Sequence, residues 1–296
     1  LVGNIFQQLY NMVDSIIVGN FVGANALGAI GTTNSLNFFF FSLVAGLSVG
    51  IGIIVAQYFG FGDEEKVKDA IGNSIWIITI CSVIMAIIGF VTARPILVLL
   101  DTDPVILNDA VEYLKVVSIG IVCVGFYNGV SGILRALGDS KTPLIFLIVA
   151  SVLNVILDLI FVLSFGWGVV GAGVATAFSQ LISALACIIY AYKSNTYFKL
   201  KKKNIKLNGN IIKKICKLGI PVALQNSLIA FSLIVLQKVV NGYGATFTTA
   251  FTVVSRIETL VQQPFMSLGA AVSTYTGQNI GAGLKDRVRK GFNSAT

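Results

Sequence analysis

Two aspartates, Asp14 and Asp158, lie well inside long apolar stretches of this 296-residue chain. A charge at the centre of an apolar membrane helix costs about 2.5–3.5 kcal/mol on insertion scales, so such residues need a partner or a role. No Lys or Arg occurs within residues 1–19 or 144–165 to neutralise either carboxylate. The two acids are therefore predicted to bind a proton or a metal cation, either separately or shared between the two carboxylates. Their oxygen ligands suit a proton or a hard cation such as Na⁺.

Further polar side chains recur at helical spacing around these acids. Gln7, Asn11 and Asp14 are four and three residues apart, so they share one helix face. Asn154 and Asp158 are four residues apart and share a face in the same way. For an isolated amide or hydroxyl, an interhelical hydrogen bond is the alternative to a role at a binding site. Other polar candidates within apolar stretches are Tyr10, Asn128, Thr176 and Gln180.

A third acid inside a predicted apolar stretch, Glu258, follows Arg256 by two residues. Two interpretations stay open for this pair. The residues could neutralise each other as a structural ion pair, or they could line a substrate cavity.

Composition limits the classes of protein that could carry these residues. Of the chain, 55% is hydrophobic and 11% is charged, and the mean hydropathy is +0.86, whereas soluble domains carry about 25% charged residues. The absence of histidine excludes Ser-His-Asp catalysis and His-ligated metals. The four cysteines show no CxxC spacing, and no phosphate-binding loop is present, so neither an enzyme nor an ATP-driven pump is predicted.

The fold class predicted is an all-α polytopic membrane protein. A bilayer core needs about 20 apolar residues as helix, and eight stretches qualify. Their limits are 1–19, 36–58, 72–100, 109–134, 144–165, 169–192, 218–241 and 251–277.

Basic residues predict the orientation of these spans. Seventeen of the 21 Lys and Arg residues fall in the even-numbered connections and after the last span, and none falls in the odd-numbered ones. By the positive-inside rule, these connections and the N-terminal side of the first span face the cytoplasm. The net charge of +8 therefore needs no nucleic-acid partner. The lysine-rich run 199–206 is expected to be a solvated loop beside anionic lipid.

An internal repeat at an offset of 221 residues divides the chain. The segment that begins Gln57-Tyr58-Phe59-Gly60 is similar to the segment that begins Gln278-Asn279-Ile280-Gly281. Parallel repeats of this kind build transporters from two similar bundles. We therefore expect a first six-helix bundle over 1–192, a basic cytoplasmic linker over 193–217 and the start of a second bundle over 218–296. A complete molecule would have twelve spans, so this chain is expected to be truncated to about eight.

Five motifs stand out along the chain. They are Gln7-Gln8-Leu9-Tyr10-Asn11-Met12-Val13-Asp14, Leu134-Arg135-Ala136-Leu137-Gly138-Asp139-Ser140-Lys141-Thr142-Pro143, Asn154 with Asp158, Gly166-Trp167-Gly168-Val169-Val170-Gly171-Ala172 and Gly281-Ala282-Gly283. These motifs resemble those of the multidrug and toxic compound extrusion (MATE) transporters, and most closely the bacterial DinF-type branch. The resemblance implies two bundles in a V around a central cavity. It also implies export of small, often cationic and amphiphilic drugs in exchange for H⁺ or Na⁺, without a cofactor.

The resemblance also implies roles for individual residues. The carboxylates of the coupling site would be Asp14 and Asp158, with Asn128, Asn154 and Thr176 beside them. A Na⁺ ion, if used, would be bound by Asp14, Asn154, Asp158 and Thr176. The seventh span, residues 221–241, contains no acid, which favours coupling through the first bundle. The substrate cavity would be lined by Gln7, Tyr10, Asn11, Gln180, Arg256 and Glu258.

The expected setting is a bacterial plasma membrane, in which we expect the protein to be a monomer surrounded by lipid. The main alternative is a flippase for lipid-linked oligosaccharides from the same superfamily. A flippase must handle an anionic diphosphate, and only Arg256 and Lys238 are available as cavity cations. A passive channel fits the parallel repeat and the buried carboxylates less well than a carrier does.

Overall fold

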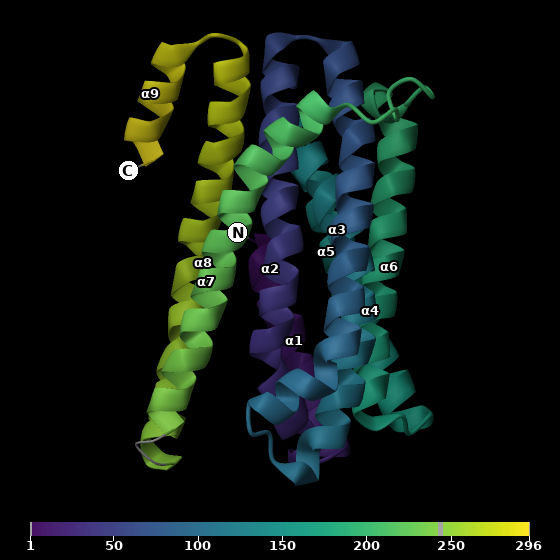
Figure 1. Cartoon of the computed structure of the whole chain (residues 1–296), viewed down its shortest axis with the longest axis vertical. Coiled ribbons are helices and arrows are strands. Elements are labelled where there is room, and N and C mark those ends of the chain that lie inside the picture. Colours follow the sequence, from purple (N-terminus) through teal and green to yellow (C-terminus); the bar gives the residue numbers. More distant parts are fainter. Residues whose placement is uncertain (1, 242–244, 296) are drawn as a thin grey trace.

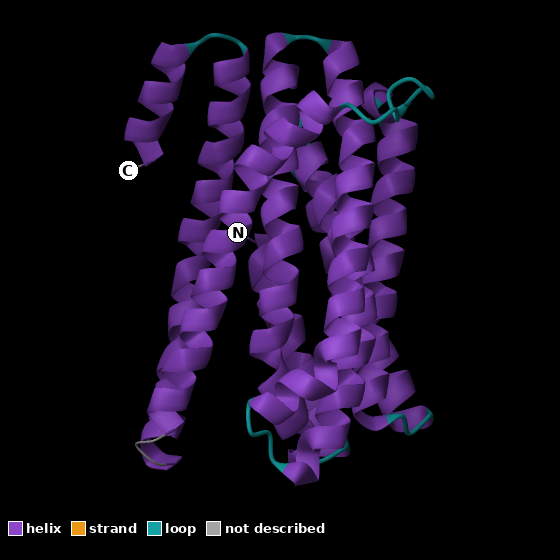
Figure 2. Cartoon of the chain, in the orientation of Figure 1, coloured by secondary structure: helices purple, strands orange, loops and turns teal. Residues whose placement is uncertain are grey.

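The computed structural model describes residues 2–241 and 245–295, and within them it leaves out some side chains, including those of Gln7, Tyr10, Asn11 and Arg256. The described chain is helical, without strands (Figure 1 and Figure 2). Its long helices are α1 (Val2–Phe21), α2 (Ala24–Phe61), α3 (Glu64–Leu99), α4 (Pro104–Ala136), α5 (Lys141–Asp158), α6 (Gly168–Ser194), α7 (Gly209–Asn241) and α8 (Ala245–Gly281). The shorter ones are η1 (Leu159–Ser164), η2 (Thr196–Phe198) and α9 (Lys285–Ala295).

Each predicted span corresponds to one long helix. Among the described residues, six helical segments have the length and hydropathy to cross a membrane, and a shorter apolar segment, Met12–Phe21, belongs to α1. Two predicted spans, 36–58 and 218–241, begin later than the observed helices, since α2 begins at Ala24 and α7 at Gly209. In α2, Thr32 and Thr33 donate their hydroxyls to carbonyls of the same helix. These bonds let polar residues continue the helix where the sequence alone indicated a loop.

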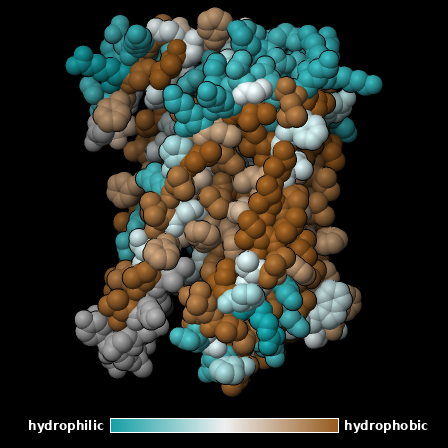
Figure 3. All heavy atoms as spheres, viewed as in Figure 1, coloured by the Kyte–Doolittle hydropathy of each residue, from teal (hydrophilic) through white to brown (hydrophobic). Residues whose placement is uncertain are grey.

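The basic connections gather at one end of the molecule, where a polar layer covers the helix ends above a broad apolar band (Figure 3). Local capping explains the tight turn between α2 and α3. Gly62 adopts the left-handed conformation after α2, and Asp63 accepts the Lys66 backbone N–H at the start of α3. The common placement of these connections agrees with the predicted alternation of the spans.

The linker between α6 and α7 is docked on α3, while the lysines of the run 199–206 stay exposed as expected. Asn204 is 1% exposed and donates to Asp69 and, more weakly, to Glu65. Asn73 accepts the Asn208 backbone N–H at 2.7 Å, and Trp76 donates its indole N–H to the Ile205 carbonyl at 2.9 Å. The linker is pinned because Glu65, Asp69, Asn73 and Trp76 follow one another at spacings of four, four and three along one face of α3.

Helices α2 and α8 cross in a pair of reciprocal contacts that follow the sequence repeat. A Cβ placed on Gly60 would overlap the Gln278 backbone oxygen, and one placed on Gly281 would overlap the Gln57 backbone oxygen. Gly60 and Gly281 are 221 residues apart, as are Gln57 and Gln278. Beside this crossing the Gln278 side chain donates to the Ala136 carbonyl at the end of α4 at 2.8 Å. The two copies of the repeat therefore contact each other at the basic end through equivalent residues.

Helix α7 packs against the same side of α2 as α8 does. A Cβ on Gly46 or Gly50 would overlap the backbone of Ala223 or Gly219, so the two helices approach at backbone distance. The Ser42 and Ser227 hydroxyls are hydrogen-bonded across this contact at 2.9 Å. In Figure 1, α7 and α8 lie close to α2 near the basic end and diverge from the other helices toward the opposite end. The described part of the molecule is therefore closed at the basic end.

Candidate functional site

Asp14 on α1 and Asp158 at the end of α5 come together between two packed helices. The side chains are 8% and 0% exposed, and the two carboxyl groups interact with each other. Among the described residues, neither acid forms a salt bridge. The pair predicted from the sequence therefore exists as one buried site, without a described cation beside it.

The surroundings of this acid pair are apolar. Ile17 and Val18 follow Asp14 by three and four residues, and they pack in one cluster with Val162, which follows Asp158 by four. The same cluster includes Ala172 of α6 and Tyr113 of α4. Such a shell supplies few hydrogen bonds to an ionised carboxylate, so its charge must be balanced by something bound at the site.

Polar side chains with neutral oxygens lie beside this pair, beginning with Asn154 one helical turn before Asp158. Asn154 is 1% exposed, and its amide donates to the Thr176 hydroxyl of α6 across a long 3.4 Å bond. Gln180 follows Thr176 by one turn and is 5% exposed. The structure thus joins α1, α5 and α6 at the place that the polar stripes indicated.

Buried oxygens without a donor concentrate at this site. Among the described residues, eight buried side-chain atoms lack a hydrogen-bond partner, and five of them belong to four of these residues. All five are acceptors, and no donor within the described part of the chain satisfies them. Unsatisfied buried acceptors are costly and call for an explanation such as a bound ion. The five atoms are Asp14 Oδ1, Asp158 Oδ1 and Oδ2, Asn154 Oδ1 and Gln180 Oε1.

A π-helical turn follows Asp158 directly and was not predicted from the sequence. Leu159–Ser164 is wound as a π-helix, which is a rare form that often occurs at functional sites. Phe161 and Trp167 stack at a ring distance of 5.3 Å, and Trp167 donates its backbone N–H to the Phe161 carbonyl. A Cβ on Gly171 would lie 3.1 Å from the same carbonyl. The signal that could have revealed this turn is the glycine-flanked Trp167 after an aromatic run.

Among the remaining predicted residues, Asn128 and Glu258 form their described side-chain bonds within their own helices. Asn128 is half-buried, and its amide donates to the Val124 carbonyl of its own helix. Glu258 is exposed on α8 and accepts a bond from Gln262 at 3.0 Å. The side chains of Gln7, Tyr10, Asn11 and Arg256 lie outside the described part of the structure. The predicted Arg–Glu pairing therefore stays a prediction.

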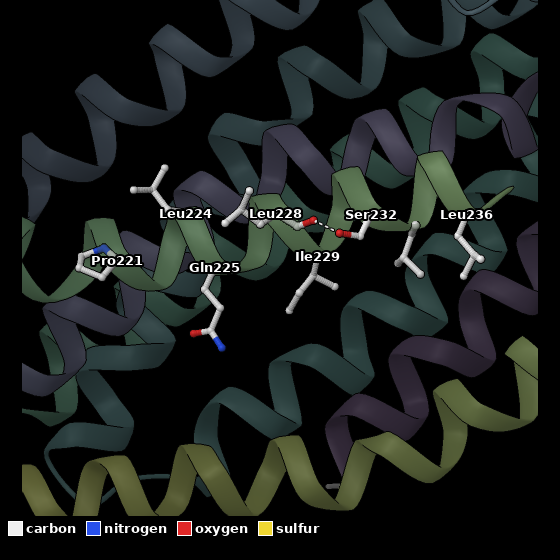
Figure 4. A pocket seen from close by; sticks show the side chains of 8 residues that line it. Pro221, Leu224, Gln225, Leu228, Ile229, Ser232 and Leu236 are labelled. Atoms are coloured by element: carbon white, nitrogen blue, oxygen red, sulfur yellow. Dashed lines mark hydrogen bonds between the residues drawn. The ribbon is translucent and has the colours of Figure 1, made fainter. Parts of the chain in front are cut away.

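A large open pocket of about 610 Å³ lies along α7, as Figure 4 shows. Its lining comes from one face of this helix, with Gln225 and Ser232 as the polar members. Ser232 donates to the Leu228 carbonyl of the same helix at 2.8 Å. Of the residues predicted to line a substrate cavity, the two with described side chains, Gln180 and Glu258, do not contribute to it.

Oxygen acceptors alone restrict the chemistry of the buried site. Within the described residues, no group of three or more His, Cys, Asp or Glu side chains could hold a metal ion. Two carboxylates with neutral oxygens beside them suit a proton or one monovalent cation better than a transition metal. Long apolar helices, an internal repeat and a buried ionisable site are features typical of multi-pass membrane transporters.

Comparison with known proteins specifies the family. The profile of the MatE family matches residues 1–160 and 221–296. The chain therefore belongs to the MatE family, whose members include the MATE transporters. This result confirms the family that the sequence motifs resembled.

Individual relatives support the same assignment. The chain is 34% identical to the probable multidrug resistance protein YpnP of Bacillus subtilis over 97% of its length. It is 25% identical to the probable multidrug resistance protein NorM of Thermotoga maritima over 96%. It covers 64% of the first of these proteins and 62% of the second, so it spans slightly less than two thirds of the curated relatives that it matches.

Solved structures share the fold. A multidrug resistance MATE family transporter in an outward-facing conformation superposes with a TM-score of 0.93 at 27% identity. A transporter of the MOP superfamily from Pyrococcus furiosus gives 0.91 at 26% identity. Each alignment covers 99% of this chain and 65% of the other.

Proposed function

We propose that the protein is a secondary active multidrug exporter, which binds its coupling ion in the first bundle and exchanges organic compounds for H⁺ or Na⁺ across a bacterial plasma membrane. One observation carries the proposal: five buried acceptor oxygens lack a donor, three of them in the Asp14–Asp158 pair and one each in Asn154 and Gln180. Relatives that are named as multidrug resistance proteins support the drug part of the proposal. The absence of an acid from residues 221–241 supports coupling through the first bundle.

In the proposed mechanism, the ion and the drug favour different arrangements of the helices, so that binding of one weakens binding of the other. Entry of a cation would screen the repulsion between Asp14 and Asp158 and allow α1 to approach α5. The π-helical turn after Asp158 would absorb the change in α5, because its wider winding can shift by one residue. The ion drives export only if it binds the two arrangements of the helices with different affinity.

The orientation of the exporter follows from its charges. The positive-inside rule places the basic end in the cytoplasm. Since α2, α7 and α8 are in contact at that end, the described arrangement corresponds to a carrier closed toward the cytoplasm. This agrees with its similarity to a transporter in an outward-facing conformation.

Dye transport in liposomes tests the proposal. Purified protein would be reconstituted, and uptake or release of a fluorescent cationic dye would be followed under an imposed pH gradient and then an imposed Na⁺ gradient. We expect one gradient to drive dye movement in the wild type and Asp158→Asn to reduce the rate at least about tenfold, because this amide cannot bind a proton or neutralise a cation.

Asp286→Asn is the matched control, since this acid lies on the exposed α9. It should transport at the wild-type rate. Dye that moves under neither gradient in any variant would overturn the proposal and would favour the flippase. Normal coupled transport by Asp158→Asn would remove the aspartates from the mechanism.

A further inference from the structure

A second cavity lies between α3 and α7. Its volume is about 440 Å³, and its lining is apolar apart from two thiols and an indole N–H. The indole N–H of Trp76 is already bound to the Ile205 carbonyl, so the two thiols, Cys81 and Cys216, are the remaining weakly polar groups of the lining. The principal lining residues are Leu47, Trp76, Ile80, Leu207, Cys216 and Ile220.

The docked linker forms the upper rim of this groove at the basic end. Leu207 contributes to the lining, and its neighbours are fixed to α3 by the bonds of Asn73 and Trp76. A Cβ on Gly72 would overlap the Asn204 backbone oxygen, so the linker lies directly on the helix surface. The linker is therefore held in a fixed position at the rim of the groove.

Two exposed lysines lie at this rim, and neither forms a salt bridge within the described part of the chain. Lys206 lies between Ile205, which is bonded to Trp76, and Leu207, which lines the groove. Lys213 precedes Cys216 by three residues and Ile220 by seven, so it shares their face of α7 and lies nearer the basic end. The acids on the neighbouring face of α3 are engaged elsewhere, since Glu65 pairs with Lys203 and both Glu65 and Asp69 accept from Asn204.

An apolar groove below a pair of lysines is complementary to a membrane ligand that has an apolar chain and an anionic headgroup. We propose that the groove binds an acyl chain of an anionic phospholipid from the leaflet at the basic end, and that Lys206 and Lys213 hold its phosphate. Positive charge near an anionic leaflet contributes about 1 kcal/mol per lysine, and the fixed rim positions both charges above the acyl chain. A zwitterionic lipid would fill the same groove without the full charge complementarity.

The bound lipid would join the two parts of the repeat. The groove walls come from α2 and α3 on one side and from α7 on the other. An occupant between them contacts the first bundle and the start of the second at once. It therefore stabilises the arrangement in which they are closed at the basic end, by its differential affinity for that arrangement.

Native mass spectrometry and thiol labelling test this lipid site. The protein would be placed in nanodiscs of phosphatidylglycerol or of phosphatidylcholine. We expect one phosphatidylglycerol to remain bound after release into detergent, and maleimide to modify Cys216 several-fold more slowly in phosphatidylglycerol. Cys123 is an internal control, because it is partly accessible and does not line the groove.

Charge variants separate a specific site from general attraction to the membrane. The double variant Lys206→Gln/Lys213→Gln should bind phosphatidylglycerol roughly thirtyfold more weakly. The control Lys285→Gln/Lys290→Gln removes the same charge from α9 and should bind like the wild type. Equal retention of the two lipids, or full retention by the Lys206→Gln/Lys213→Gln variant, would overturn the proposal. Both readouts measure binding alone, so they are independent of drug transport.

Discussion

Asp158 is completely buried, yet neither of its oxygens has a hydrogen-bond donor among the described residues. The sequence predicted this site because Asn154 and Asp158 lie four residues apart in a stretch without basic residues. It could not separate Thr176 from Asn128, since both are isolated polar residues in apolar helices. The structure separates them by packing: Thr176 accepts a bond from Asn154, whereas Asn128 bonds to its own helix.

A prediction at this scale concerns the Thr176 hydroxyl. Thr176→Val keeps the shape of the side chain but leaves the Asn154 amide without its acceptor. We expect a loss of stability of about 1 kcal/mol, because the lost bond is long, and a several-fold higher ion concentration for half-maximal transport. Thr92→Val is the control, since its hydroxyl is exposed and bonds only to Ile88. Thermal unfolding and ion titration of dye transport measure both effects, and an unchanged titration would contradict the assigned role.

At the scale of the helices, the crossing of α2 and α8 depends on the absence of side chains at two glycines. Gly281→Ala would insert a Cβ into the Gln57 backbone oxygen, so the crossing must open. We expect the melting temperature to fall by several degrees, because overpacking costs about 1–3 kcal/mol. Gly269→Ala on the same helix has open space around it and should be neutral or slightly stabilising. Equal melting temperatures for the two variants would show that this contact is absent in the membrane.

The attachment of the linker to α3 gives a second prediction for this scale. Asn73→Ala removes the acceptor of the Asn208 backbone N–H. Hydrogen exchange at Asn208 should become roughly fivefold faster, since a net hydrogen bond contributes about 1 kcal/mol. Thr79→Ala, which removes an exposed hydroxyl bonded within α3, is the control. Unchanged exchange at Asn208 would mean that other contacts hold the linker in place.

Acidity should loosen the same attachment. The ion pair with Lys203 and the bond from Asn204 lower the pKa of Glu65 below its usual 4.5. A carboxylate with a lowered pKa contributes stability that is present above its unfolded pKa and is lost as the pH falls through its folded value. Linker exchange, corrected for the intrinsic effect of pH, should therefore rise only below about pH 4.5. In Glu65→Gln this rise should be absent, and a rise of equal size there would contradict the role of Glu65.

For the molecule as a whole, the repeat was the most informative sequence signal. The offset of 221 residues predicted two related helix pairs, and the contacts of Gly60 and Gly281 have that relation. Two features were beyond the sequence analysis. The π-helical turn depends on aromatic packing after Asp158, and the docking of the linker depends on a face of α3 that is recognisable only beside its partner. Both arise from tertiary contacts, which the periodicity of a single segment does not encode.

The most direct test of the central claim measures ion release when a drug binds. Cationic dye would be added to purified, weakly buffered protein, and the released H⁺ and Na⁺ would be recorded with a pH indicator and a sodium electrode. If the two compete through the Asp14–Asp158 site, the wild type should release one of these ions on binding dye. The same dye should release none from Asp158→Asn. Dye binding without release of either ion, or equal release from the variant, would contradict the account.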